Sequence, residues 1–168
     1  MEITKKEIIN LKERKPIDEV CFKPIGLIHT PFKTLKGIPI QSSMLEIEGT
    51  IEIFPEYKDG LYELGGFSHI YCLYFFDLVK LPVPLQSKPF LVDEKKGVFA
   101  TRTPFRPNRI GLSILQILSQ DDNKIQVRNV DILDKTYILD IKPYVPEFDC
   151  REVQRIGWLQ DNIKRKVS

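Results

Sequence analysis

The chain has 168 residues and a mass of 19.6 kDa, which is the size of one compact domain. Hydrophobic residues make up 42% of the sequence and charged residues 29%, and these proportions argue against a disordered, fibrous or membrane-embedded chain. The net charge is only +2, so any nucleic-acid binding must come from a local basic patch.

The first residues mix acidic and basic side chains, whereas a secretory signal needs a basic start followed by a long apolar segment. We therefore expect a cytoplasmic protein with no membrane partner. Residues 2–15 carry Ile3, Ile8, Ile9 and Leu11 among charges, which predicts a short amphipathic helix that Pro16 would end. Residues 1–21 are predicted to be a helical appendage.

From residue 22 onward, short stretches rich in Ile, Val, Phe and Tyr are separated by Pro, Gly and Asp. Strands are predicted at residues 22–28, 44–54, 67–76, 97–101, 125–133 and 138–143. Apolar and acidic side chains alternate over 45–53, which indicates a half-exposed antiparallel strand. The run 70–76 has no polar face and is predicted to be central and covered on both sides.

Helical patterns are weak in this sequence. Residues 55–61 could form one or two turns, and residues 110–118 fit either a strand or a helix. Near the end, Val153, Ile156 and Trp158 are spaced so that a helix could dock by them. The predicted fold class is mainly β, a small antiparallel β-barrel over residues 22–150 with a few short helices. Residues 151–168 are predicted to form a helix and basic tail packed on the barrel.

Several kinds of site are disfavoured by the motifs that the sequence lacks. There is no Gly-x-Gly-x-x-Gly dinucleotide motif, no phosphate loop and no Gly-x-Ser-x-Gly elbow. The three cysteines, Cys21, Cys72 and Cys150, form no C-x-x-C pair, and we expect reduced thiols and no metal site. Cys72 lies in a run apolar enough to keep its thiol buried and inert.

Residues 97–113 are the most informative part of the sequence. Arg102, Arg106 and Arg109 alternate with prolines, which hold the cationic side chains on a stiff backbone. Guanidinium groups suit a carboxylate, a phosphate or the face of a nucleobase. The pattern indicates a binding loop, although a proline-stiffened surface loop with solvated arginines fits the composition equally well.

Three other side chains have both a functional and a structural interpretation. His69 follows a glycine pair at the start of the most apolar strand and could orient a substrate or act as a base, or it could be a hydrogen-bonded structural residue. Asp134 fits a turn acceptor. Asp140 alternates with apolar neighbours and could pair with an arginine.

Five ordered blocks of the sequence resemble the TsaA-like (TrmO) family. They are residues 24–32 (PIGLIHTPF), 54–61 (FPEYKDGL), 66–70 (GFSHI), 100–108 (ATRTPFRPN) and 139–144 (LDIKPY). Members of that family form a small β-barrel that binds S-adenosylmethionine without a Rossmann fold and usually dimerises. Characterised members methylate N6 of threonylcarbamoyladenosine next to the tRNA anticodon, at position 37.

The resemblance implies S-adenosylmethionine as cofactor, tRNA as partner and a homodimer. The cofactor pocket that it implies consists of Pro39, Ile40, Gln41, Asp77, Leu78, Arg102, Leu112, Asp134, Lys135, Thr136 and Tyr137. In that pocket Arg102 would hold the methionine carboxylate, and backbone groups of the Asp134 turn would read the adenine edge.

Substrate binding is expected from Arg106, Asn108 and Arg109, with the two arginines free to meet phosphate. His69 and Asp140 are the candidate catalytic residues, as bases that could remove a proton from a weakly acidic nitrogen. Methyl transfer from a sulfonium mainly needs alignment and exclusion of water, so no acid–base pair is strictly required. The alternatives are a methyltransferase with a different acceptor and a cofactor-binding module without catalysis.

This chain departs from the common family pattern at a few positions. It has Arg109 where Pro is common, Asp77 where His is common, and Lys135 and Tyr137 where Gly and Pro are common. Loss of Gly and Pro from the 134–137 turn changes the backbone geometry that the turn can adopt.

Overall fold

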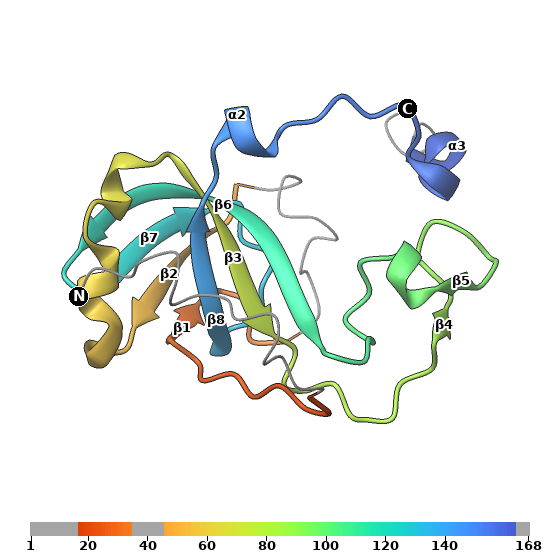
Figure 1. Cartoon of the computed structure of the whole chain (residues 1–168), viewed down its shortest axis with the longest axis horizontal. Helices are drawn as coiled ribbons and strands as arrows, with labels where there is room; N and C mark the ends of the chain where they lie inside the picture. The colour runs from red at the N-terminus through yellow and green to blue at the C-terminus, as the bar shows by residue number, and fades with distance from the viewer. Residues whose placement is uncertain (1–16, 35–45, 164–168) are drawn as a thin grey trace, which may run out of the picture.

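A computed structural model describes residues 17–34 and 46–163 of the chain. Six antiparallel strands form a closed barrel in the order β1-β2-β7-β6-β3-β8, and two short strands, β4 and β5, form a separate hairpin (Figure 1). The strands are β1 (Gly26–His29), β2 (Glu48–Ile53), β3 (His69–Phe75), β4 (Gln86–Ser87), β5 (Lys96–Gly97), β6 (Ile110–Asp121), β7 (Lys124–Arg128) and β8 (Thr136–Pro143). The predicted mainly β barrel is confirmed.

The helices are short and lie outside the barrel wall. They are the 3-10 helices η3 (Pro55–Leu61), η4 (Leu64–Gly66), η5 (Val98–Ala100) and η6 (Gly157–Leu159), and the α-helices α2 (Pro146–Asp149) and α3 (Gln160–Ile163). Among the described residues, no helix has the length and apolar composition needed to cross a membrane. The predicted helix at residues 2–15 lies outside the described residues.

The barrel is closed around a core of alternating apolar side chains. In β2, Ile51 and Ile53 point inward while Thr50 and Glu52 lie on the outer face, as the alternation predicted. The interior is filled by these side chains together with Ile28, Ile70, Cys72, Leu115, Ile125, Val127 and Ile138. Cys72 is fully buried, and burial raises the pKa of its thiol, which agrees with the prediction of an inert side chain.

Strand β3 lies between β6 and β8, so its central position is confirmed. The prediction that both of its faces are covered is wrong, because only Ile70, Cys72 and Tyr74 are buried. Tyr71, Leu73 and Phe75 on the outer face are half-buried. The absence of a polar face therefore marks an apolar outer surface rather than a second buried layer.

Two other predicted elements differ from the structure, and a third, left open, is settled by it. Residues 97–101 form no barrel strand, because the chain turns into η5, where Thr101 N donates to Val98 O at 3.2 Å. The strand predicted at 125–133 ends at Arg128, because Asn129 adopts a left-handed φ of 67° that interrupts the ladder. Residues 110–118, which fitted a strand or a helix, belong to strand β6.

Between β3 and β6 the chain leaves the barrel as a long excursion, which we call the arm (residues 76–109). The arm contains the β4–β5 hairpin and η5 and extends away from the barrel (Figure 1). The indole of Trp158 donates from Nε1 to Ala100 O at 2.8 Å, so the C-terminal segment contacts the arm rather than the barrel wall where it was predicted to pack. Residues 164–168 of that tail lie outside the described part.

Candidate functional site

The strand order gives the barrel two distinct ends. At one end β1 and β3 finish and β6 and β8 begin, and we call it the loop end. There Phe75 pairs with Ile110, and Ile28 pairs with Thr136. At the opposite end, the helix end, β3 begins and η3 and η4 lie (Figure 1).

Most of the residues that the resemblance implied for the cofactor pocket gather at the loop end. They are Asp77 and Leu78 after β3, Arg102 in the arm, Leu112 in β6, and the turn and strand start at Asp134, Lys135, Thr136 and Tyr137. Pro39, Ile40 and Gln41 lie outside the described residues. The described chain on either side of them reaches the same end, because Phe32 O accepts from Asp134 N and Ile47 O accepts from Val130 N.

Asp134 fixes the turn at the loop end. One carboxylate oxygen, Oδ1, accepts from the backbone N–H of Thr30 at 2.9 Å, and the other, Oδ2, lies 2.6 Å from Lys33 Nζ. The hydrogen bond from Lys33 lowers the pKa of this carboxyl group, although its side chain is only 7% exposed and burial acts in the opposite direction. Asp134 therefore links its turn to the segment at residues 30–33, since Thr30 is 104 residues away in the sequence, rather than acting as the local turn acceptor that was predicted.

The 134–136 turn is further held by its backbone. Lys135 N donates to Ile28 O at 2.7 Å, and Thr136 Oγ1 donates to Leu133 O at 2.8 Å. Lys135 itself has a φ of 63°, the left-handed conformation that glycine adopts without strain. The turn thus keeps a tight geometry although glycine is absent.

The arginine loop is stiffened by its own side chains as well as by proline. Arg106 Nη1 donates to Thr101 O at 3.0 Å, and Arg109 Nη1 donates to Val79 O at 2.9 Å. The Arg109 guanidinium also lies 4.6 Å from the centre of the Phe75 ring, in cation–π geometry. Arg106 and Arg109 were predicted to be free to bind phosphate. In the structure each donates at least one hydrogen bond to a backbone carbonyl group that holds the loop.

Arg102 and Asn108 are exposed members of the same loop. The positive charge of Arg102 acts on the hydroxyl of Tyr74, whose pKa it lowers slightly against the larger effect of burial, which raises it. Arg102 therefore lies close to the buried top of the barrel interior. This position suits a guanidinium that meets a carboxylate from the loop side.

Beneath the loop lies a buried polar chain that the sequence analysis missed. Tyr74 Oη is 3.2 Å from Ser113 Oγ, and Ser113 Oγ donates to Asp131 Oδ1 at 2.6 Å. Because Asp131 accepts the Ser113 proton, the Tyr74 hydroxyl is placed to donate to Ser113 Oγ. Ser113 sits at an inward position of the apolar strand β6, and that break in the alternation is the signal that could have revealed it.

Of the two candidate catalytic residues, His69 does not join the loop end. His69 opens β3 at the helix end, about 20 Å along the strand from Phe75 at a rise of about 3.3 Å per residue. Its Nδ1 lies 3.0 Å from Ser68 Oγ, and its ring meets Tyr144 edge-on at 6.4 Å between centroids. Within one chain, His69 is thus remote from Arg102 and Asp134.

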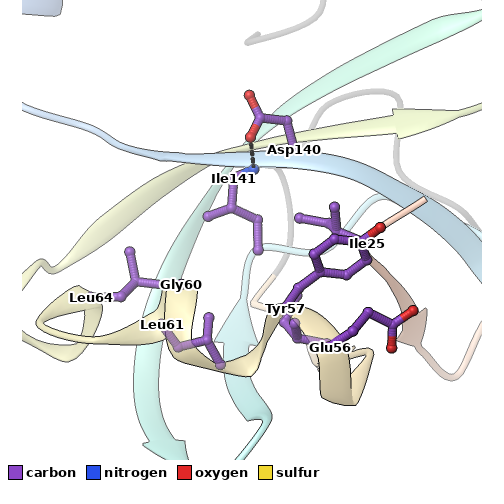
Figure 2. A pocket seen from close by; sticks show the side chains of 9 residues that line it. Ile25, Glu56, Tyr57, Gly60, Leu61, Leu64, Asp140 and Ile141 are labelled. Carbon is purple, nitrogen blue, oxygen red and sulfur yellow. Dashed lines mark hydrogen bonds between the residues drawn. The ribbon is translucent and has the colours of Figure 1, made fainter. Parts of the chain in front are cut away.

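Asp140 pairs with a lysine rather than with an arginine. Its Oδ2 lies 2.9 Å from Lys142 Nζ, and its Oδ1 accepts from the backbone N–H of Ile141. Asp140 borders a hollow of about 380 Å³ at the helix end, but Figure 2 shows its carboxylate on the opposite side of β8 from Ile141 and Tyr57. Asp140 lines this hollow, whereas His69 does not.

Residues 17–34 and 46–163 contain no cluster of three or more His, Cys, Asp or Glu side chains that could hold an ion. The loop end instead combines an exposed guanidinium with apolar surface from Leu112 and Tyr137 on the outer face of the wall. Such a mixture fits a nucleoside that carries an amino-acid end.

The fold and the loop end define a class: a small closed barrel that offers a nucleoside site without a Rossmann sheet. The family model for the tRNA-methyltransferase O N-terminal domain matches residues 27–150. The chain therefore belongs to the tRNA-methyltransferase O family, whose class is that of the S-adenosylmethionine-dependent methyltransferases.

Individual relatives agree with this assignment. A probable S-adenosyl-L-methionine-binding protein of Pyrococcus abyssi is 51% identical over 147 residues, which are 87% of this chain and 79% of the relative. A tRNA (adenine(37)-N6)-methyltransferase of Mus musculus is 34% identical over 137 residues, 76% of this chain and 31% of the relative. The crystal structure of TrmO from Pseudomonas aeruginosa superposes with a TM-score of 0.71 at 34% identity, covering 83% of this chain and 62% of that one. The chain thus spans less than two thirds of that TrmO chain and about a third of the mouse enzyme.

Proposed function

We propose that this chain transfers the methyl group of S-adenosylmethionine to N6 of threonylcarbamoyladenosine at position 37 of tRNA. The observation that carries the proposal is the gathering of Arg102, the Asp134 turn, Leu112 and Tyr137 at one end of a barrel of this family. The acceptor is supported by the name of the mouse relative, a tRNA (adenine(37)-N6)-methyltransferase. We also propose that the reaction takes place in the cytoplasm.

Each part of the loop end has a task in this proposal. The cofactor, when bound, supplies a methyl group on a good leaving group. Arg102 binds the methionine carboxylate, and the backbone N–H and C=O groups at 134–136 meet the adenine edge. Leu112 and Tyr137 cover apolar parts of the ligand and exclude water, and the rigid arginine loop keeps the substrate aligned with them.

Proton removal from the substrate nitrogen is a separate requirement, and the geometry limits which side chains can meet it. His69 lies away from the loop end of its own chain, and Asp140, which lies opposite Leu73 beside Leu112, is paired with Lys142. We propose that a base, where one is used, comes from a second copy whose helix end faces this loop end. In-line displacement at a sulfonium proceeds mainly by alignment, so the loop end needs no base of its own.

A second copy is supported by the outer face of the barrel, and we propose a homodimer. Side chains of β3 and β6 form an apolar stripe there: Tyr71, Leu73, Leu112, Ile114 and Leu118. A contiguous apolar surface on a barrel wall is typical of an interface. Because Leu112 belongs both to this stripe and to the proposed pocket, a dimer along the stripe would cover the cofactor.

The proposal is tested by methyl transfer to a matched pair of tRNAs. One tRNA carries threonylcarbamoyladenosine at position 37, and the other is the same sequence with unmodified adenosine. We expect methylation of the first only, located at N6 by mass spectrometry of the nucleosides. Arg102→Ala should raise the KM for the cofactor at least tenfold, while Arg151→Ala, an exposed arginine outside the loop end, should not.

Two results would contradict the proposal. Cofactor binding by calorimetry with no transfer to either tRNA would indicate a binding module. Equal methylation of both tRNAs would show that the threonylcarbamoyl group is not required for the substrate to be recognised.

A further inference from the structure

The arm carries the excess positive charge of the molecule. Residues 76–109 contain seven Lys or Arg and three Asp or Glu, a net charge of +4 in a chain whose total is +2. The rest of the chain is therefore net negative by two charges. Since cationic surface attracts the phosphate backbone, the arm is the natural electrostatic docking surface for a nucleic acid.

The tip of the arm, residues 88–95 between β4 and β5, presents an aromatic ring to solvent. Phe90 is 89% exposed, directly after Pro89, and it borders an open hollow of about 390 Å³ lined by residues 88–93. Phe90 therefore contributes almost nothing to a core. An exposed aromatic ring among lysines is the arrangement on which unpaired bases stack.

The charges around this ring are partly paired. Lys88 Nζ lies 2.7 Å from Asp93 Oδ1, and Lys96 Nζ lies 2.6 Å from Glu94 Oε2. Within residues 17–34 and 46–163, Lys95 has no carboxylate partner. Lys95 thus remains available at the tip for a phosphate.

The tip is joined to the arginine loop. Val98 N donates to Leu85 O at 3.0 Å, which closes the base of the hairpin, and Arg106 Nη1 lies 3.5 Å from Val98 O and 3.0 Å from Thr101 O. These hydrogen bonds connect the hairpin base to the loop that bears Arg102.

We propose that the tip binds unpaired nucleotides of the substrate RNA, with one base stacked on Phe90 and a neighbouring phosphate on Lys95. This inference rests on the proposed function, because it names the surface that receives the tRNA. The tip itself is neutral, with two Lys and two Asp or Glu, and the net charge of +4 lies in the rest of the arm, where it favours an RNA over a second protein chain as the molecule that reaches the tip. The stacked nucleotide would be one other than the modified base, since the arm extends away from the barrel (Figure 1).

The test measures binding of an anticodon stem-loop RNA to the full chain by fluorescence anisotropy. Phe90→Ala should weaken binding about tenfold, which corresponds to about 1.4 kcal/mol and lies within the range for one stacked base. Phe90→Trp should retain binding because it keeps a ring, whereas Phe90→Leu should behave like Phe90→Ala. Lys95→Ala should lower the slope of log affinity against log salt by about one.

Tyr62→Ala provides the matched control. Tyr62 is 83% exposed, but it lies at the helix end beside Glu63, and its loss should leave RNA binding unchanged. Cofactor binding by calorimetry should be the same in all five variants and the wild type, which shows that the loop end is intact.

The possible results separate the two proposals. Equal RNA binding by Phe90→Ala and Tyr62→Ala would overturn the inference and leave the proposed function standing. A change in oligomeric state of Phe90→Ala with unchanged RNA affinity would overturn it in favour of a protein contact at the tip. No RNA binding by the wild type would overturn both.

Discussion

The backbone at Lys135 is left-handed, with a φ of 63°, in the turn that follows Asp134. This conformation costs a residue with a Cβ about 1–2 kcal/mol, whereas glycine adopts it without this cost. Glycine also costs about 0.5–1 kcal/mol through the greater freedom of the unfolded chain. We therefore expect Lys135→Gly to raise the free energy of unfolding by about 0.5–1 kcal/mol, measured by urea denaturation.

Lys124→Gly is the control for this substitution. Lys124 begins strand β7, where φ is ordinary, so the same change should lower stability by about 0.5–1 kcal/mol. A loss of stability in both variants would mean that the left-handed backbone at Lys135 carries no strain.

Side-chain roles at the residue scale were predictable where the partner lies on the same element and not where it is distant in the sequence. The partners of Asp134 were not predictable as those of a turn acceptor, because Thr30 is 104 residues away in the sequence and Lys33 follows it. The lysine partner of Asp140 was within reach of the sequence pattern, because Lys142 lies two residues along the same strand and period-two alternation puts both side chains on one face. The Tyr74–Ser113–Asp131 chain joins three separate strands or loops, which spacing in sequence cannot reveal.

Strand β1 passes very close to β2 at Gly26. A Cβ at this position would collide with the carbonyl oxygen of Glu52, a backbone atom that cannot rotate away. Gly26→Ala should therefore lower the free energy of unfolding by about 3 kcal/mol, as overpacking against fixed atoms does. Chemical denaturation followed by circular dichroism measures the effect.

Gly60→Ala is the corresponding control in η3. No heavy atom lies within 4 Å of the Cβ that it would add, so stability should change by less than about 0.5 kcal/mol. Similar stabilities of the two alanine variants would show that β1 and β2 can separate without cost.

Strands in which apolar and polar side chains alternate with a period of two were predictable from the sequence. Strand β2 is confirmed because its acidic and apolar side chains separate onto two faces. Residues 97–101 have the same β-rich composition, but no neighbouring barrel strand pairs with them, and the chain forms η5 there. Composition predicts that a segment can be extended, whereas pairing decides whether it is a strand.

At the scale of the molecule, a small β-barrel followed from many short strands and few helices, and the structure confirms it. The arm was not predicted as a unit, because its hairpin strands β4 and β5 have only two residues each and leave no periodicity to detect. The separation of His69 from the loop end was also hidden, since it depends on the direction in which β3 runs.

The apolar stripe on β3 and β6 leads to the last prediction, on oligomeric state. Ile114 is 39% exposed in the middle of this stripe, opposite Tyr71 on the neighbouring strand. If a second copy covers the stripe, Ile114→Lys buries an unpaired charge at the interface and should convert a dimer into a monomer. Light scattering after size exclusion gives the mass, with Thr50→Lys on the outer face of β2 as a control that should remain dimeric.

A wild type of 19.6 kDa in solution, or an Ile114→Lys variant that stays dimeric, would show that the stripe is not the interface. Loss of the dimer together with loss of methyl transfer, but with an unchanged unfolding midpoint, is the expected result, because the proposed base and the cover of the cofactor both come from the second copy.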